Sequence, residues 1–333
     1  MQQPLVSINI PVYKCEAYIQ RCMESVKAQT YPNIETIFVN DATPDNSVAL
    51  IEEFMQNNPQ LSMRLVHLEK NQGLSVVRNR GIDESSGKYI YMLDSDDYIT
   101  PDCIEKLVIN SEKYNVEISV AETVCEYEDT GERAYLFRIN SINSIVMENE
   151  RIFKRFVYGD WPIIAPNKLY LKSFITKNNL RFVPNLYSQD ELWAFHCAEK
   201  LHSISFIHDT TYIYYLHSKS TIANKKKVNF ENHQTILEWF TKSYHQSKNA
   251  DRKKWIRKKI VNFKDLTMIM QYKFMRDDVS YWKQNYRRTQ KAPGLKLSDY
   301  LTNDFTKKEK KANILYNLPA EIGYQLFKKR YNG

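Results

Sequence analysis

Several features that mark secreted, membrane-spanning or fibrous proteins are missing from this 333-residue sequence. No apolar run approaches the roughly 20 residues that cross a bilayer. The start, Met1-Gln2-Gln3-Pro4, lacks the basic and apolar segments of a signal peptide. Glycine and proline, with 8 and 11 residues, are too few for a fibrous or disordered chain. The 5 cysteines are widely spaced with no C-x-x-C, which favours reduced thiols in a cytoplasmic protein over disulfides or a zinc site.

Two common phosphate-binding loops are missing as well. No G-x-G-x-x-G follows the first strand-like segment, which argues against an NAD or FAD site. No G-x-x-x-x-G-K-[ST] occurs, which excludes a P-loop. A bound phosphate would therefore have to be neutralised by a metal ion and arginine instead.

The net charge of +8 hides an uneven distribution. Residues 1–224 contain 21 Lys and Arg against 29 Asp and Glu, a net charge of −8. Residues 225–333 contain 26 against 10, a net charge of +16. This asymmetry predicts a domain boundary near Lys225 and a basic module with an anionic partner.

The first hundred residues alternate between strand-like and helix-like patterns. Three strand–helix crossovers in succession predict a right-handed, largely parallel α/β sheet, with ligands at the carboxyl ends of its strands. Later segments predict two more strands and two helices, a polar hairpin or loop at 128–144, and basic helices from about residue 230. The expected strands are 5–12, 34–39, 63–68, 88–93, 116–127 and 204–216; the expected helices are 16–29, 48–54 (start), 75–84, 149–158 and 189–200.

An acidic cluster, Asp94-Ser95-Asp96-Asp97, directly follows the apolar strand Tyr89–Leu93. Three carboxylates so close together repel one another unless a cation binds them. Mg²⁺ and Mn²⁺ prefer oxygen ligands, and Mg²⁺ is usually held by one or two carboxylates together with substrate phosphates. The cluster therefore predicts a site for a metal-bound diphosphate. A solvated loop, or Asp97 as the cap of a helix that opens near Pro101, is the alternative.

Five stretches together resemble the family 2 glycosyltransferases of the GT-A fold, especially bacterial enzymes that build capsule, exopolysaccharide or O-antigen repeats. They cover about residues 5–222 in the expected order, whereas the last 110 residues contain no motif that we can assign. The stretches are VSINIPVYKCEAYIQRCMESVKAQTYPNIETIFVNDATPDNS, NQGLSVVRNRGIDESSGKYIYMLDSDDYITPD, PNKLYLKSFI, SQDELWAF and YIYYLHSKST.

The resemblance implies a GT-A domain at 1–224, with a nucleotide-binding half at 1–115 and an acceptor-binding half at 116–224. The charge and helical patterns predict a basic helical region at 225–333 after it. It implies an inverting, Mn²⁺- or Mg²⁺-dependent enzyme that transfers a sugar from a nucleotide-sugar, expected to be UDP-linked. The acceptor would be a hydroxyl of a glycan or lipid-linked saccharide in surface polysaccharide synthesis. A sugar-1-phosphate nucleotidyltransferase is an alternative, but the Gly-rich loop expected for it is missing. An inactive sugar-nucleotide-binding or scaffolding subunit is another.

The resemblance also implies roles for donor-site residues. Asp96 would bind the metal directly, and Asp94 would reach the ribose or the metal. Asp41 would accept a hydrogen bond from uracil N3–H, although Asn40 and Ala42-Thr43 depart from the family pattern on either side of it. The other predicted donor-site residues are Pro11 and Tyr13 beside the base and ribose, Asn71 and Ser95, and Arg78 facing the diphosphate, with a structural salt bridge as the alternative for Arg78.

Acceptor activation is assigned by the same resemblance to the run Gln189-Asp190-Glu191. Inverting transfer needs a carboxylate that takes a proton from the acceptor hydroxyl. Asp190 aligns with the family's general base, and Glu191 is the runner-up because Gln189 replaces the usual glutamate. Helix-dipole complementation is the alternative for both. His217 would be a third metal ligand or a leaving-group contact, or an ordinary surface or core residue. Trp161 and Trp193 would stack on sugar faces, but the helical spacing of Trp193 favours a place in the core.

The basic C-terminal region has an apolar stripe at helical spacing, made of Leu315, Leu318, Ile322, Leu326 and then Phe327. A helix of this kind suits an anionic membrane surface, which would place the protein in the cytoplasm or peripherally on the inner face of the plasma membrane. A helical subdomain with the stripe as its core, or a homodimer interface, is the alternative. We find no nucleic-acid-binding motif and expect no nucleic acid partner.

Overall fold

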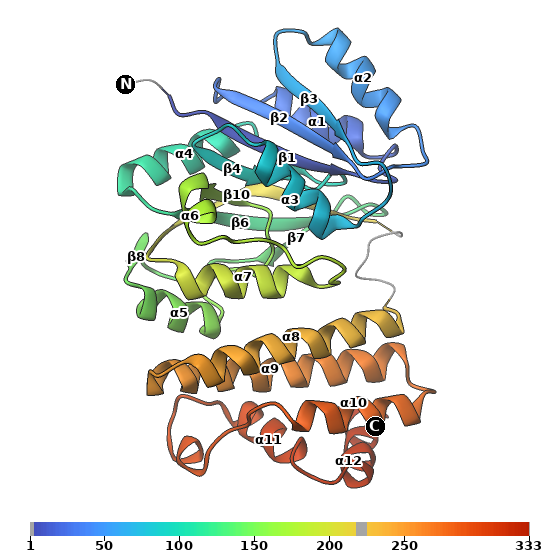
Figure 1. Ribbon diagram of the computed structural model, residues 1–333, viewed down its shortest axis with the longest axis vertical. Helices are drawn as coiled ribbons and strands as arrows, with labels where there is room; N and C mark the ends of the chain where they lie inside the picture. Colours follow the sequence, from blue (N-terminus) through green and yellow to red (C-terminus); the bar gives the residue numbers. More distant parts are fainter. Residues whose placement is uncertain (1–2, 218–224, 333) are drawn as a thin grey trace. The chain divides into compact units, whose positions relative to one another are not determined.

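The computed structural model describes residues 3–217 and 225–332. The chain divides into two compact units, Met1–Ser220 and Thr221–Gly333, close to the change of charge in the sequence. The first unit is an α/β domain and the second consists of helices (Figure 1). In the described ranges, none of the helices combines the length and the apolar character needed to cross a bilayer.

One mixed sheet runs through the whole first unit. Its strand order is β3-β2-β1-β4-β9-β6-β10-β5, with β7 paired to β6 and β8 to β10. β1 to β4 are parallel, as the three crossovers predict, and β9 runs antiparallel between β4 and β6. The strands are β1 (Val6–Val12), β2 (Ile34–Asn40), β3 (Ser62–His67), β4 (Tyr89–Met92), β5 (Tyr98–Ile99), β6 (Ile118–Tyr127), β7 (Arg133–Phe137), β8 (Ile145–Met147), β9 (Lys168–Leu171) and β10 (Ser203–Leu216).

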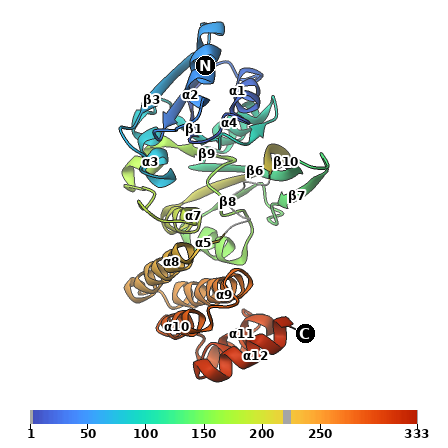
Figure 2. The same ribbon diagram turned by 90° about the vertical axis from the view of Figure 1, so that its right-hand side faces the viewer.

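Helices cover both faces of this sheet (Figure 2). The face with Val6, Ile8 and Ile10 packs against α1, α2 and α4, whereas Ile37 and Val39 pack against Val77 of α3 on the opposite face. The helices of this unit are α1 (Ile19–Lys27), α2 (Ser47–Asn57), α3 (Leu74–Glu84), α4 (Cys103–Tyr114), α5 (Asn149–Tyr158), α6 (Lys172–Lys177) and α7 (Gln189–Lys200).

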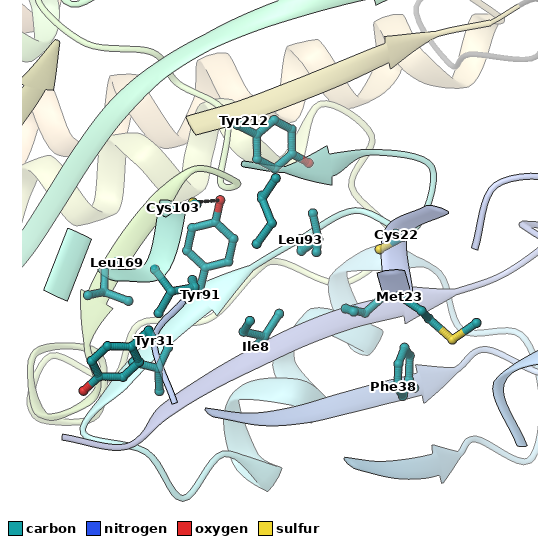
Figure 3. Close-up of a cluster of buried hydrophobic side chains, with 14 of the residues drawn as sticks. Ile8, Cys22, Met23, Tyr31, Phe38, Tyr91, Leu93, Cys103, Leu169 and Tyr212 are labelled. Carbon is teal, nitrogen blue, oxygen red and sulfur yellow. Dashed lines mark hydrogen bonds between the residues drawn. The ribbon is translucent and has the colours of Figure 1, made fainter. Parts of the chain in front are cut away.

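One hydrophobic core cluster of the first unit reaches the end of β4. Leu93, Tyr91 and Tyr212 are buried there together with Cys22 and Cys103 (Figure 3). The Cys103 thiol donates to the Tyr91 hydroxyl at 3.4 Å, so these two polar groups within the core are paired. The polar loop that follows β4 is thereby fixed on a rigid base.

In the second unit, the residues of the expected apolar stripe do not lie on a single helix. Its elements are α8 (Lys227–Gln246), α9 (Ala250–Phe274), α10 (Val279–Gln290), η2 (Leu297–Leu301), α11 (Lys307–Leu315) and α12 (Ala320–Asn332). The prediction of one helical stripe from Leu315 to Phe327 is wrong, because α11 ends at Leu315 and Pro319, which cannot donate a backbone hydrogen bond, precedes α12. Phe327 belongs to the core, while Ile322 and Leu326 stay half exposed.

Candidate active site

The polar loops predicted from the sequence do follow adjacent strands. Val12 pairs with Asn40 and Asn40 with His67 at the carboxyl ends of β1, β2 and β3. Asp41 and the run from Asn71 therefore begin side by side at one edge of the sheet. This is the edge at which parallel α/β sheets bind their ligands.

Asp41 joins two of these loops. Its carboxylate accepts hydrogen bonds from the backbone N–H of Gln72 at 2.7 Å and of Gly73 at 2.9 Å. The Asn71 side-chain amide donates to the Asp41 carbonyl at 3.3 Å. Gly73 has φ of 82°, a conformation that favours glycine, and it opens α3. A carboxylate has about four acceptor positions, so Asp41 retains capacity for the predicted uracil contact.

The two residues predicted beside the base differ in exposure. Pro11 is half-buried at the end of β1, and Tyr13 leaves 42% of its surface exposed. The adjacent Lys14 backbone N–H donates to Thr43 Oγ1 at 2.8 Å, which ties the loop after β1 to the loop after β2. Tyr13 thus keeps part of its ring exposed on a fixed loop, with the Lys14 ammonium 5.3 Å from the ring centroid.

Asp97 holds β10 in place. Its carboxylate accepts the Tyr212 hydroxyl at 2.5 Å and the Tyr215 backbone N–H at 2.9 Å, both from β10. The alternative prediction of a helix cap is wrong, because α4 begins at Cys103 with Asp102 as its N-cap residue. Burial, reinforced by Asp96 and Asp94, raises the pKa of Asp97 well above its ordinary value.

Asp96 lies in contact with His217. His217 Nε2 lies 3.2 Å from Asp96 Oδ2, and its ring stacks on Tyr18 with centroids 4.3 Å apart. Burial, followed by the charge of Asp94, raises the pKa of Asp96, and the contact with His217 opposes that rise. Ser95, between the two aspartates, is buried.

Arg78 connects the acidic cluster to the candidate base. One guanidinium nitrogen donates to Asp94 Oδ1 at 2.8 Å and another to Asp190 Oδ1 at 2.6 Å. The Arg78 side chain is only 3% exposed. Burial disfavours its charge, but the two carboxylates outweigh this cost and raise the pKa of the guanidinium. Arg78 is therefore fixed as a cation between the two acidic sites.

Asp190 and Glu191 occupy the first turn of α7. Burial raises the pKa of Asp190 above its ordinary value, and Arg78 works against that rise. The Glu191 side chain is buried, and its backbone N–H donates to the Ser188 carbonyl at 3.1 Å. Gln189 takes part in a hydrogen bond with Ser75 of α3, so α7 and α3 are linked beside Arg78. Asp190 contacts Arg78 through its Oδ1.

The donor atoms suit a divalent metal ion. Asp96 contributes a carboxylate oxygen and His217 a ring nitrogen, both within the usual ligand set of Mn²⁺. Asp94 instead directs Oδ1 to Arg78. Within the described ranges, no three His, Cys, Asp or Glu side chains converge as a preformed set. That arrangement fits the common pattern in which one or two protein ligands share a metal with substrate phosphates.

Three features of the site could not be read from sequence patterns. Lys168 of β9 is 3% exposed, and burial lowers the pKa of its ammonium to about 7, although the nearby Asp190 opposes this. Tyr212 secures Asp97, and Tyr18 packs on His217. The only sequence signal for Lys168 was its place in the stretch PNKLYLKSFI.

The sugar-stacking hypothesis is wrong for both tryptophans, and the core position favoured for Trp193 is confirmed. Trp193 is 2% exposed, stacks on Phe182 with centroids 4.1 Å apart, and donates its indole N–H to the Tyr170 hydroxyl at 3.2 Å. Trp161 is 6% exposed and packs against Phe156. Helical and strand packing, rather than a ligand, covers these rings.

Comparisons with known sequences agree on one family. Residues 7–176 match the profile of glycosyl transferase family 2. EpsH of Bacillus subtilis (strain 168) is 30% identical over 247 residues, which cover 72% of this chain and 68% of EpsH. The glycosyltransferase GlyG of Streptococcus pneumoniae serotype 4 is 28% identical over 246 residues, covering 72% of this chain and 79% of GlyG.

Solved structures share the fold at low sequence identity. Residues 1–349 of TarS from S. aureus, in complex with UDP-GlcNAc, superpose with a TM-score of 0.72 at 16% identity, covering 96% of this chain and 88% of that one. The mannosyltransferase PcManGT from Pyrobaculum calidifontis, in complex with GDP-Man and Mn²⁺, gives a TM-score of 0.57 at 13% identity, covering 100% and 88%.

Proposed function

Since this chain belongs to glycosyl transferase family 2, we propose that it is an inverting, metal-dependent enzyme that uses a UDP-sugar. The chain is a glycosyltransferase of the GT-A fold that takes its sugar from a nucleotide-sugar. The acceptor we propose is a hydroxyl of a glycan or lipid-linked saccharide in surface polysaccharide synthesis. What we propose is that the enzyme uses a metal ion and a uridine nucleotide, inverts the configuration of the sugar, and relies on the residues described below.

The double contact of Arg78 carries this proposal. Arg78 is bonded at the same time to Asp94 of the acidic cluster and to Asp190 at the start of α7. A fixed planar cation at this position suits the negative charge of a diphosphate. The same guanidinium contacts Asp190, so the candidate base lies close to the acidic cluster that would hold the diphosphate. A base and a leaving group need this kind of proximity for a single displacement.

In the proposed reaction, Asp190 takes the proton of the acceptor hydroxyl as the acceptor oxygen forms its bond to the anomeric carbon. The bond from that carbon to the UDP oxygen breaks in the same step, and UDP leaves with the bonding electrons. Attack from the face opposite UDP turns an α-linked donor into a β linkage. General-base catalysis of this kind typically contributes 10²–10⁴-fold to a rate.

Asp96 and His217 are the residues we propose to hold Mn²⁺ or Mg²⁺, with Asp94 reaching either the metal or the ribose. The metal would supply Lewis-acid neutralisation of the diphosphate charge. The relevant neighbours support these choices, because TarS was solved with UDP-GlcNAc and PcManGT with GDP-Man and Mn²⁺. For this chain we propose UDP because the Asp41 carboxylate suits uracil N3–H.

Location follows from the acceptor. A lipid-linked saccharide would be met at the cytoplasmic face of the plasma membrane, so we propose a cytoplasmic protein that binds this surface peripherally. The basic second unit, with its net charge of +16 over residues 225–333, supports an anionic surface as partner.

A donor panel tests the proposal. Purified full-length protein would be incubated with UDP-, GDP- and ADP-linked sugars and Mn²⁺, and release of the nucleoside diphosphate would be measured with and without short saccharide acceptors. We expect UDP release from at least one UDP-sugar, stimulated by an acceptor and abolished by EDTA. A nucleotidyltransferase would instead consume UTP and a sugar 1-phosphate and release pyrophosphate. An inactive binding subunit would be stabilised by a donor without releasing UDP.

A further inference from the structure

Two leucines of the second unit are almost fully exposed on the connection between α10 and α11. Leu297 and Leu301 are the first and last residues of η2, and 89% and 91% of their surfaces are exposed. Their neighbour Leu295 packs against the hydrophobic cluster of this unit. This segment therefore packs one of its three leucines against the core and leaves the other two exposed. Figure 1 shows the connection from α10 to α11 as a loop at the end of the unit away from the C-terminus.

The turn that carries these leucines is anchored from the inside. Asp299, between them, is 3% exposed and receives two hydrogen bonds of 2.9 Å from the Arg257 guanidinium of α9. The Lys296 backbone N–H donates to the same carboxylate at 2.8 Å. Asn313 of α11 also donates to the Tyr300 hydroxyl at 2.7 Å. A turn fixed in this way holds its leucines outward without the entropy cost of ordering a flexible loop.

The acidic residues of this segment face inward. The three acids between residues 291 and 311 each pair with a cation of α9. The pairs are Asp299 with Arg257 at 2.8 Å, Asp304 with Lys254 at 2.9 Å and Glu309 with Lys258 at 2.7 Å. Among residues 291–311 the exposed charges are therefore positive, and they belong to Lys291, Lys296, Lys307, Lys308 and Lys311. On α9, the exposed Asp251 pairs with Lys254.

We propose that Leu297, Leu301 and the surrounding lysines form a membrane-contact site that inserts into an anionic lipid surface. Exposed apolar side chains flanked by lysines match the chemistry of an interface where acyl chains lie below anionic headgroups. This site lies in the second unit, does not depend on the proposed reaction, and replaces the stripe from Leu315 to Phe327 as the membrane-binding element.

A second copy of the chain fits the same surface poorly. Two leucines offer far less than the roughly 1,200 Å² of total buried area that a stable protein interface needs. A two-fold contact would also place the lysines of one copy against those of the other. A bilayer supplies both the apolar layer and the negative charge.

Co-sedimentation of the full chain with vesicles tests this site. We expect binding to phosphatidylcholine vesicles that contain phosphatidylglycerol, weaker binding as salt rises, and little binding to phosphatidylcholine alone. The double variant Leu297→Ser/Leu301→Ser should bind anionic vesicles at least about tenfold more weakly, because its apolar area is lost. The variant Lys291→Gln/Lys307→Gln/Lys311→Gln should weaken binding and reduce its dependence on salt.

The matched control is Ile322→Ser/Leu326→Ser, since these residues of α12 are 51% and 47% exposed and belong to the other apolar stripe. It should bind as the unmodified chain does. Full binding by the Leu297/Leu301 variant would overturn the proposal, as would loss of binding by the control instead. If only the lysine variant weakened binding, the protein would adsorb to the anionic headgroups without inserting its leucines. That result would also overturn the proposal.

Insertion itself has a direct readout. The five native cysteines are buried, so Leu301→Cys offers an exposed thiol for an environment-sensitive fluorophore. On anionic vesicles its emission should shift to the blue and be quenched by nitroxides placed on the upper acyl chain. A fluorophore that remains in water while the protein co-sediments would contradict insertion.

Discussion

Asp94 and Asp190 share one arginine although 96 positions separate them in the chain. Sequence patterns predicted each aspartate and Arg78 separately, through the strand end, the helix start and the family resemblance. The bridge itself could not be predicted, because the packing of α3 beside α7 decides it. The positive charge of Arg78 lies between the two carboxylates and opposes the rise that burial causes in the pKa of Asp190.

A pair of conservative variants distinguishes the roles of the two acids in the first turn of α7. Asp190→Asn should lower kcat by a factor of about 10² or more with little change in donor affinity, because it removes the general base and keeps the shape. Glu191→Gln is the matched control and should retain most of the activity. Steady-state UDP release and UDP binding measure the two quantities. An active Asp190→Asn beside an inactive Glu191→Gln would mean that the other carboxylate is the base.

Lys168 predicts an unusual pH dependence of stability. Burial lowers its folded-state pKa to about 7, below the unfolded value of 10.5. Between these values the unfolded chain binds more protons than the folded one, so this group makes the free energy of unfolding rise with pH from about 7 to 10. Lys168→Met should remove that rise, which is on the order of a few kcal/mol. Urea unfolding at pH 7 and pH 9.5 measures it, and an equal pH slope in both proteins would contradict a buried lysine of low pKa.

The elements of the sheet show where sequence patterns sufficed. β1 to β4 are rich in β-branched and apolar residues and lie between polar turns, although Glu35 and Arg64 interrupt β2 and β3. Their existence, order and parallel direction could therefore be predicted. β5 has two residues and β9 four, one of them Lys168, and neither shows a period of its own. They form because Tyr98 and Ile99 pair with β10, and because β9 fits antiparallel between β4 and β6. Contacts distant in sequence determine them.

Asp97 is the anchor by which the end of β10 reaches the acidic loop. Tyr212→Phe should lower the free energy of unfolding by about 1–3 kcal/mol, because it leaves a buried carboxylate short of one donor. Tyr214→Phe, two residues along the same strand and packed on the same core, is the control and should change stability less. Urea unfolding compares them. Equal, small effects would mean that Asp97 is adequately satisfied by the Tyr215 N–H alone.

At the scale of the whole molecule, the sequence predicted two parts of opposite charge but misplaced the apolar surface of the second. The change from a net −8 to a net +16 was visible in composition, and the units divide close to it. The exposed pair Leu297 and Leu301 was not visible, because only the fold shows that Asp299 turns inward and the leucines outward. Helical spacing placed Phe327 on the apolar stripe expected to contact a membrane, but the fold buries this residue.

The central claim is that the cluster from Asp94 to Asp97 binds the diphosphate of a UDP-sugar through a metal ion. Calorimetric titration of UDP into the full chain tests it most directly, with Mn²⁺ or with EDTA and with Asp96→Ala as the matched variant. The account predicts UDP binding that requires Mn²⁺, is weakened at least about tenfold in Asp96→Ala, and exceeds the binding of GDP. UDP binding of equal affinity in EDTA and in Mn²⁺ would contradict it.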